Sequence, residues 1–212
     1  MVVLELDDSY RYVEKRLGNL KSKTPKVLAK SINDTAKWAR RALADEARKT
    51  YTVRLAGFNG AMKIKNARYS NLEAIIKTEG ETIQLVKYHK SAGKKATKAE
   101  VLSGGGLKAL EKKGIKAFVA KTSNGHTGIY QRKYRYDKDN PSYRKPKNFA
   151  DKSARNHNRK IHGKPIKTLF SNSIPMMIGN EDRVYGIVEP KINEYLQKQI
   201  DRHIEKVLGG YE

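Results

Sequence analysis

The chain has 212 residues, of which 38% are hydrophobic, and it carries a formal net charge of +23 and no cysteine. These values predict a folded protein with a sizeable core, and they exclude disulfides, thiol catalysis and zinc–thiolate sites. No apolar run approaches the roughly 20 residues that span a bilayer, so we expect no membrane partner. The N-terminus lacks a basic region followed by an apolar stretch, so we expect no signal peptide. The absence of cysteine favours folding inside the cell.

The positive charge is concentrated in the middle of the sequence. Residues 87–167 contain 23 Lys or Arg and 5 Asp or Glu, which gives +18. Residues 1–86 contain 17 and 10, and residues 168–212 contain 5 and 7. A segment of one charge sign repels itself unless it meets a polyanion or an acidic protein surface, or stays solvated. Nucleic acid is the commonest of these partners.

The first third of the chain is expected to be helical. Residues 8–17 suggest a short helix, and residues 21–51 a long one with Thr24 as N-cap and Pro25 in its first turn. Trp38 lies off the centre of the apolar stripe, so it belongs either to a subunit contact or to the edge of the core. Apolar residues recur in the long helix every three or four positions and form a narrow stripe: Leu28, Ile32, Ala36, Ala39, Leu43 and Ala47.

Beyond Tyr51 the pattern favours strands. The sequence TEGET at residues 78–82 predicts a turn that pairs residues 72–77 with residues 82–88. Residues 91–114, rich in Gly, Lys and Ala, are expected to form a loop followed by a short strand or a helical turn.

A second hairpin is predicted between AFVA (residues 117–120) and GIY (residues 128–130). Within it, Phe118 and either Ile129 or Tyr130 are expected to face the core. This hairpin leads into the most basic part of the chain.

The last third is expected to combine a basic loop with a second long helix. Residues 133–164 contain two prolines, many Lys, Arg and Asn, and few large apolar residues, which predicts a long loop insertion. A helix follows from Gly179, in which Pro190 marks the start or causes a kink. It has an apolar stripe and ends at two glycines: Val188, Ile192, Leu196, Ile200, Ile204 and Val207, then Gly209 and Gly210.

The order of these elements predicts an α+β fold. We expect one domain over residues 1–212, with a long N-terminal helix and a long C-terminal helix packed on a mostly antiparallel sheet, and with the basic loop as an insertion.

No catalytic or metal-binding pattern is found in the sequence. The five histidines have no paired-ligand spacing: His89, His126, His157, His162 and His203. The glycine-rich residues 103–106 lack the spacing of a phosphate-binding loop. We therefore predict a protein that is not an enzyme, with no catalytic residue, no metal ligand and no cofactor.

Basic and aromatic residues interleave in the middle third, which favours contact with a polyanion. No sequence signature of a known nucleic-acid-binding fold accompanies them, so the contact would be with the nucleic-acid backbone or with an acidic protein. The residues expected to contact DNA or a partner are all basic: Lys94, Lys95, Lys98, Arg132, Lys133, Arg135, Arg144, Lys145, Lys147, Arg155, Arg159 and Lys160.

Two parts of the chain resemble the bacteriophage minor tail protein Z family of tail-completion proteins. KSINDTAKWARRALADEARKTYTV (residues 30–53) is similar to the opening helix of that family. GIKAFVAKTSNGHTGIYQRK (residues 114–133), followed by KPIKTLFSNSIPMMIGN (residues 164–180) and the terminal helix, is similar to its hairpin and its Pro-Ile phrase. The basic insertion between Tyr134 and Lys164 departs from the family pattern.

The resemblance implies a structural protein of the virion that is made in the host cytoplasm and lies at the head-proximal end of a phage tail. It implies a homo-oligomeric ring, hexameric to match the tail tube, with tube, terminator or adaptor proteins as neighbours. Basic loops would face DNA in the tail channel or an acidic partner ring. A sequence-nonspecific nucleic-acid-binding protein is the alternative. Large residues expected at a subunit interface are Trp38, Phe170, Ile174, Met176 and Met177.

Overall fold

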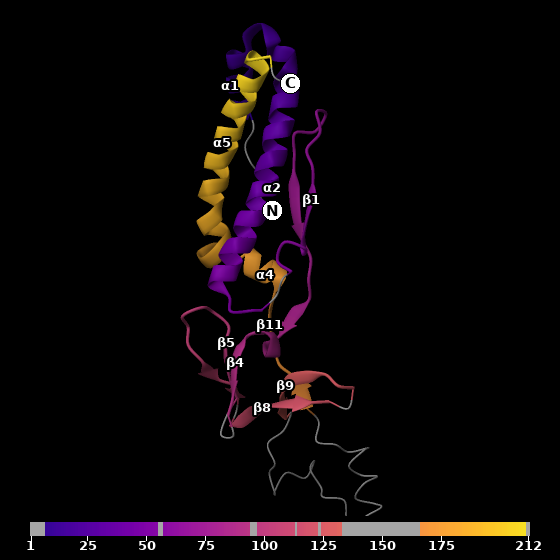
Figure 1. Cartoon of the computed structure of the whole chain (residues 1–212), viewed down its shortest axis with the longest axis vertical. Helices are drawn as coiled ribbons and strands as arrows, with labels where there is room; N and C mark the ends of the chain where they lie inside the picture. The colour runs from indigo at the N-terminus through magenta and orange to yellow at the C-terminus, as the bar shows by residue number, and fades with distance from the viewer. Residues whose placement is uncertain are drawn as a thin grey trace, which may run out of the picture. The chain divides into compact units, whose positions relative to one another are not determined.

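The computed structural model describes residues 7–54, 57–93, 97–112, 114–122, 124–132 and 166–210. The predicted basic loop, residues 133–164, lies outside these ranges. Helices and antiparallel strand pairs make the fold α+β, as predicted (Figure 1). The residues form two compact units: unit 1 contains residues 1–51, 55–82 and 172–212, and unit 2 contains residues 52–54 and 83–171. The assignment of the whole chain to one domain stays a prediction.

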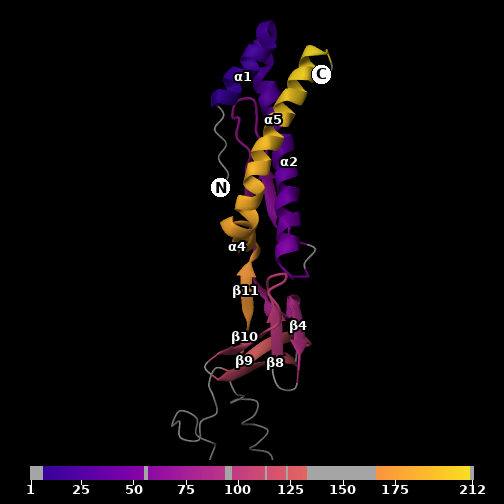
Figure 2. The same ribbon diagram turned by 90° about the vertical axis from the view of Figure 1, so that its left-hand side faces the viewer.

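Unit 1 is built on two long helices, α2 (Thr24–Thr50) and α5 (Gly186–Leu208), which lie side by side in Figures 1 and 2. A shorter helix, α1 (Asp7–Leu17), adds Val13 and Leu17 to the same core cluster. The predicted stripes are confirmed, because removing these side chains from water drives the helices together. Their buried members are Leu28, Ile32, Ala36, Ala39, Leu43 and Ala47 in α2, and Val188, Ile192, Leu196, Ile200 and Ile204 in α5.

Helix α2 begins without the side-chain cap that the sequence predicted. Thr24 has the helical dihedral angles φ −51° and ψ −49°, whereas an N-cap residue is non-helical. Its buried hydroxyl has no hydrogen-bond partner in the described structure. The reason is that a 3₁₀ helix, η1 (Gly18–Lys23), runs directly into α2, and the carbonyl of Lys21 accepts the N–H of Thr24. Pro25 does lie in the first turn, as predicted.

Two short helices precede α5: α4 (Ile174–Ile178) and the π-helix η3 (Glu181–Tyr185). A Cβ atom at Gly186 would collide with the backbone oxygen of Glu181, so the π-turn depends on glycine at this position. Pro190 lies inside α5, four residues after its first residue, so it does not mark the start of the helix, which was one of the two predictions for it. At the other end, Gly210 adopts a φ of +75°, which terminates the helix.

The predicted hairpin between residues 72–77 and 82–88 is wrong. Strand β2 (Ile75–Thr78) pairs instead with β1 (Met62–Lys65), so that Ile64 lies opposite Ile76. Strand β1 lies beside α2 in both views of the chain (Figures 1 and 2).

The residues after β2 explain this difference. Gly80 does not have the positive φ that tight hairpin turns favour, so residues 78–82 do not reverse the chain as a two-residue hairpin does. Strand β3 (Thr82–Gln84) pairs with β11 (Phe170–Ser173), far along the sequence.

Unit 2 contains the predicted hairpin of β8 (Ile115–Lys121) and β9 (Thr127–Arg132), in which Phe118 pairs with Tyr130. Ile129 is fully buried and Tyr130 is 8% exposed, so both are core residues, whereas Phe118 is half-buried. The outer strands β7 (Glu111–Lys112) and β10 (Ile166–Thr168) complete a four-stranded sheet in the order β10-β9-β8-β7.

A three-stranded sheet accounts for much of the rest of unit 2. After the 3₁₀ helix η2 (Leu85–Lys87), it contains β4 (His89–Ala92), β5 (Thr97–Glu100) and β6 (Lys108–Ala109). The segment expected to be a loop before one short element is therefore richer in strands than its composition indicated.

Candidate functional site

Two of the twelve basic residues predicted to contact DNA or a partner lie in the described structure. Lys98 on β5 and Arg132 on β9 are both exposed, and they belong to different sheets of unit 2. The other ten lie outside the described residues: Lys94, Lys95, Lys133, Arg135, Arg144, Lys145, Lys147, Arg155, Arg159 and Lys160.

The described part of unit 2 is strongly basic even without those ten residues. Its two carboxylates are Glu100 and Glu111, so its net charge is +8, ten cations minus two anions. Glu100 is already paired, since its Oε2 atom lies 2.7 Å from Nδ1 of His89, and this hydrogen bond lowers the pKa of Glu100. The ten basic side chains are all exposed: Arg54, Lys87, Lys90, Lys98, Lys108, Lys112, Lys116, Lys121, Arg132 and Lys167.

One face of the four-stranded sheet combines this charge with aromatic rings. The rings of Phe118 and Tyr130 lie 6.3 Å apart, and the guanidinium of Arg132 lies 5.8 Å from the centroid of Phe118. Lys116 projects from the same face, because alternate residues of a strand share a face. The half-buried ring of Phe118 beside two exposed cations is typical of surfaces that bind single-stranded nucleic acid, whereas Tyr130 belongs to the core.

A glycine makes room for this arrangement. A Cβ atom at Gly128 would lie 2.8 Å from the ring of Tyr130, so only glycine lets that ring fold over β9. The sequence pointed to Tyr130 and Arg132 individually, but not to the face that they share with Lys116 and Phe118. The alternation of residues in the predicted hairpin could have indicated this shared face, because alternate residues of a strand project from the same side.

The five residues predicted at a subunit interface differ in exposure. Met176 is 60% exposed and Phe170 is 50% exposed, whereas Trp38 and Ile174 are half-buried. Met177 is fully buried, so it belongs to the core of unit 1 and not to a surface, which corrects the prediction for this residue. The reason is that α4 turns adjacent side chains in different directions, as any helix does.

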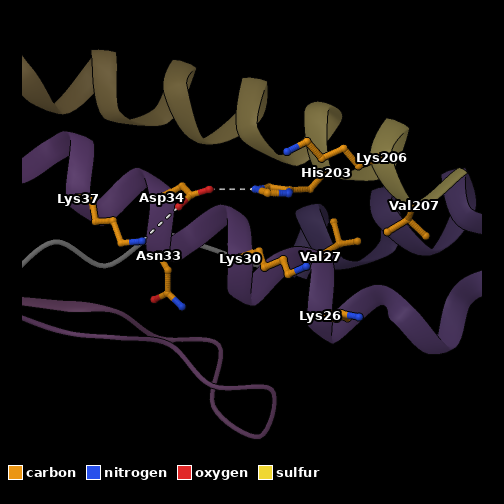
Figure 3. Close-up of a pocket in the computed structure, with 9 residues that line it drawn as sticks. All are labelled: Lys26, Val27, Lys30, Asn33, Asp34, Lys37, His203, Lys206 and Val207. Carbon is orange, nitrogen blue, oxygen red and sulfur yellow. Dashed lines mark hydrogen bonds and ion pairs between the residues drawn. The ribbon is translucent and has the colours of Figure 1, made fainter. Parts of the chain in front are cut away.

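Unit 1 contains a pocket of about 520 Å³ that the sequence analysis did not predict (Figure 3). Four lysines and one carboxylate contribute to it, together with a histidine. Helix α2 supplies Lys26, Val27, Lys30, Asn33, Asp34 and Lys37, and α5 supplies His203, Lys206 and Val207. The spacing of the α2 residues was the only signal in the sequence, because residues three and four apart share one helix face.

Asp34 links the two helices of the pocket. Its Oδ2 atom lies 3.1 Å from Nε2 of His203, and its Oδ1 atom lies 3.5 Å from the ammonium of Lys37. His203 is 8% exposed, and this burial lowers its pKa; Asp34 opposes the shift, and Lys206 and Lys30 reinforce it. Burial and the two ammonium groups therefore favour the neutral imidazole.

A second pocket of about 470 Å³ shares Lys30 and Asn33 with the first. Asn33 fixes its wall, because its side chain donates a hydrogen bond of 3.0 Å to the carbonyl of Ala67 and accepts one of 2.7 Å from the same residue's N–H. Arg68 adds another cation to this second pocket.

Within the described ranges, no three His, Asp or Glu side chains gather closely enough to hold a metal ion. None of the described helices has both the length and the apolar character that crossing a membrane requires. No protein-family model matches this chain, and no curated protein or solved structure is significantly similar to it.

Proposed function

We propose that this protein is a structural virion protein of a phage or phage-like tail. It forms a ring at the head-proximal end, completes the tail and contributes to joining the tail to the head. The resemblance of residues 30–53, 114–133 and 164–180 to the minor tail protein Z family is the starting point. The observation that carries the proposal is the charge of unit 2, whose described residues hold ten cations against two anions.

This excess of positive charge on unit 2 suits a subunit whose basic surface faces DNA in a channel or an acidic neighbouring ring. Either partner would relieve the repulsion between the cations. Exposed apolar side chains support assembly as well. Phe170 and Met176 are at least half exposed, and a neighbouring subunit would cover them.

The oligomeric state of the purified protein tests this proposal. We expect light scattering and electron microscopy to detect a ring whose mass is a multiple of the 24.1 kDa chain. Met176→Asp should weaken the assembly, because it places a charge at a subunit contact. Tyr69→Asp, at a position that is 63% exposed but outside the predicted interface, is the control. A protein that stays monomeric at every concentration and is absent from purified particles would rule against the ring.

Sequence-nonspecific binding of nucleic acid is the second candidate function, and the exposed side chains of Lys116 and Arg132 beside the half-buried ring of Phe118 favour it. Fluorescence anisotropy with a labelled oligonucleotide at several salt concentrations separates the two. A steep loss of affinity with salt, together with weaker binding by Phe118→Ala and Arg132→Gln, would support this second function. Lys121→Gln is the matched control, since Lys121 projects from the opposite face of the sheet. The ring proposal, by contrast, predicts that the protein binds free nucleic acid only weakly.

A further inference from the structure

We propose that the pocket between α2 and α5 binds a phosphate-bearing anion through Lys30, Lys206 and His203 (Figure 3). This site is made of residues of unit 1, whereas the proposed function rests on the charge of unit 2, so the inference does not depend on that function. No residue of the pocket was among the residues predicted to contact DNA or a partner.

Positive charge exceeds negative charge in this pocket. Of the described residues that line it, four are lysines and one is a carboxylate, and the two oxygens of Asp34 already contact His203 and Lys37. Among the described residues, no ion pair involves Lys30 or Lys206. Both ammonium groups nevertheless disfavour the protonated form of His203, because their positive charges repel the imidazolium. A bound anion would remove this repulsion, so the pocket is electrostatically prepared for one.

The size and the donors of the pocket suit phosphate. A volume of about 520 Å³ falls within the roughly 300–1,000 Å³ that is common for small-molecule sites. Each lysine ammonium offers three N–H donors and no acceptor, and a protonated histidine adds another donor. A phosphate offers only acceptors when fully ionised, so the two sets are complementary. Free phosphate compounds and the backbone of nucleic acid both present this group.

Binding of an anion must be coupled to protonation of His203. In the free protein, burial and the ammonium groups of Lys206 and Lys30 lower the pKa of His203, and Asp34 partly compensates. Lys26 and Lys37 line the same pocket and add to its positive field. An anion beside the imidazole stabilises the protonated form and raises the pKa. Because such coupling is reciprocal, the anion must bind more tightly as the pH falls from 7.5 to 6.

Calorimetry and NMR on the full chain test the proposal. Pyrophosphate is the probe for affinity, and sulfate, whose charge is constant over this pH range, is the probe for pH dependence. We expect the double variant Lys30→Gln/Lys206→Gln to weaken pyrophosphate binding at least about tenfold, since each lost charge pair is worth a substantial part of the binding free energy. Lys198→Gln, exposed on α5 outside the pocket, should leave the affinity unchanged.

The His203 imidazole gives a readout that needs no substitution. We expect its NMR titration to move to higher pH when sulfate or pyrophosphate is added to the wild-type protein. An unchanged titration, or pyrophosphate binding by a folded double variant equal to that of the wild type, would overturn the proposal. If the double variant does not fold, the wild-type titration alone decides.

A single-stranded oligonucleotide identifies the source of the phosphate. If the oligonucleotide displaces pyrophosphate, and if the double variant loses affinity for both, the pocket binds phosphates of a nucleic-acid backbone. If pyrophosphate remains bound in the presence of the oligonucleotide, the ligand is a free phosphate compound. Both results support the site, and both are independent of whether the protein forms a ring.

Discussion

The indole of Trp38 in α2 stacks on the ring of Tyr195 in α5, with the centroids 4.6 Å apart and the planes inclined by 8°. Both side chains are half-buried, so the pair lies at the edge of the contact between the two long helices. The sequence left two positions open for Trp38, a subunit contact or the edge of the core. The structure places it at the edge, and its participation in a subunit contact stays a prediction.

This stacked pair should couple the two helices energetically. In a double-mutant cycle with Trp38→Ala and Tyr195→Ala, we expect a coupling energy of about 0.5–1.5 kcal/mol in the free energy of unfolding, measured with urea. A cycle of Trp38→Ala with Tyr69→Ala is the control, and it should be additive because Tyr69 is largely exposed. Additive effects of Trp38 and Tyr195 would show that the stacking contributes no stability.

The two hydrogen bonds between Asn33 and Ala67 should hold the loop after β1 against α2. Asn33→Ala leaves the N–H and the carbonyl of a buried residue without partners, so we expect a loss of about 1–3 kcal/mol in stability. Hydrogen exchange of the Ala67 amide should accelerate. Asn33→Asp keeps the acceptor but loses the donor, so it should have an intermediate effect. Unchanged exchange in Asn33→Ala would contradict this role.

Stability should depend on pH through His203. The pKa of this group is lower in the folded protein than the value of about 6.5 expected in the unfolded chain. The unfolded chain therefore binds more protons near and below that pH, and the free energy of unfolding falls as the pH drops from 7 towards 5. His203→Gln should remove this part of the slope in urea titrations at each pH.

Two further variants sharpen the test of His203. Asp34→Asn removes the carboxylate that raises the pKa of His203, so the NMR titration of the imidazole should move to still lower pH. His126→Gln, at an exposed position in the β8–β9 turn, is the control that removes a histidine outside the pocket. A titration that moves to higher pH in Asp34→Asn would refute this account of the pair.

Gly186 should tolerate substitution poorly. In Gly186→Ala the new Cβ atom would collide with the backbone oxygen of Glu181, which cannot move aside as a side chain does. We expect a loss of about 1–3 kcal/mol in the free energy of unfolding, as for other overpacked sites. Gly60→Ala is the control, because its Cβ atom would have its nearest contact at 3.7 Å. Equal stability of the two variants would show that η3 adapts without cost.

The sequence by itself determined the features that depend on local periodicity. The buried stripes of α2 and α5 follow from apolar residues at three- and four-residue spacing, and the hairpin of β8 and β9 follows from alternation on both sides of a turn. The basic character of the middle third also needed only composition.

Only the tertiary structure decided which distant residues meet. Several short strands have similar alternation, so the sequence cannot choose among partners for β2 or β3, and packing selected β1 and β11. The approach of Asp34 to His203, and with it the lysine-lined pocket, exists because two helices from opposite ends of the chain bury their apolar stripes against each other. Burial of those stripes fixes how the helices face, and the polar residues beside the stripes are brought together as a result.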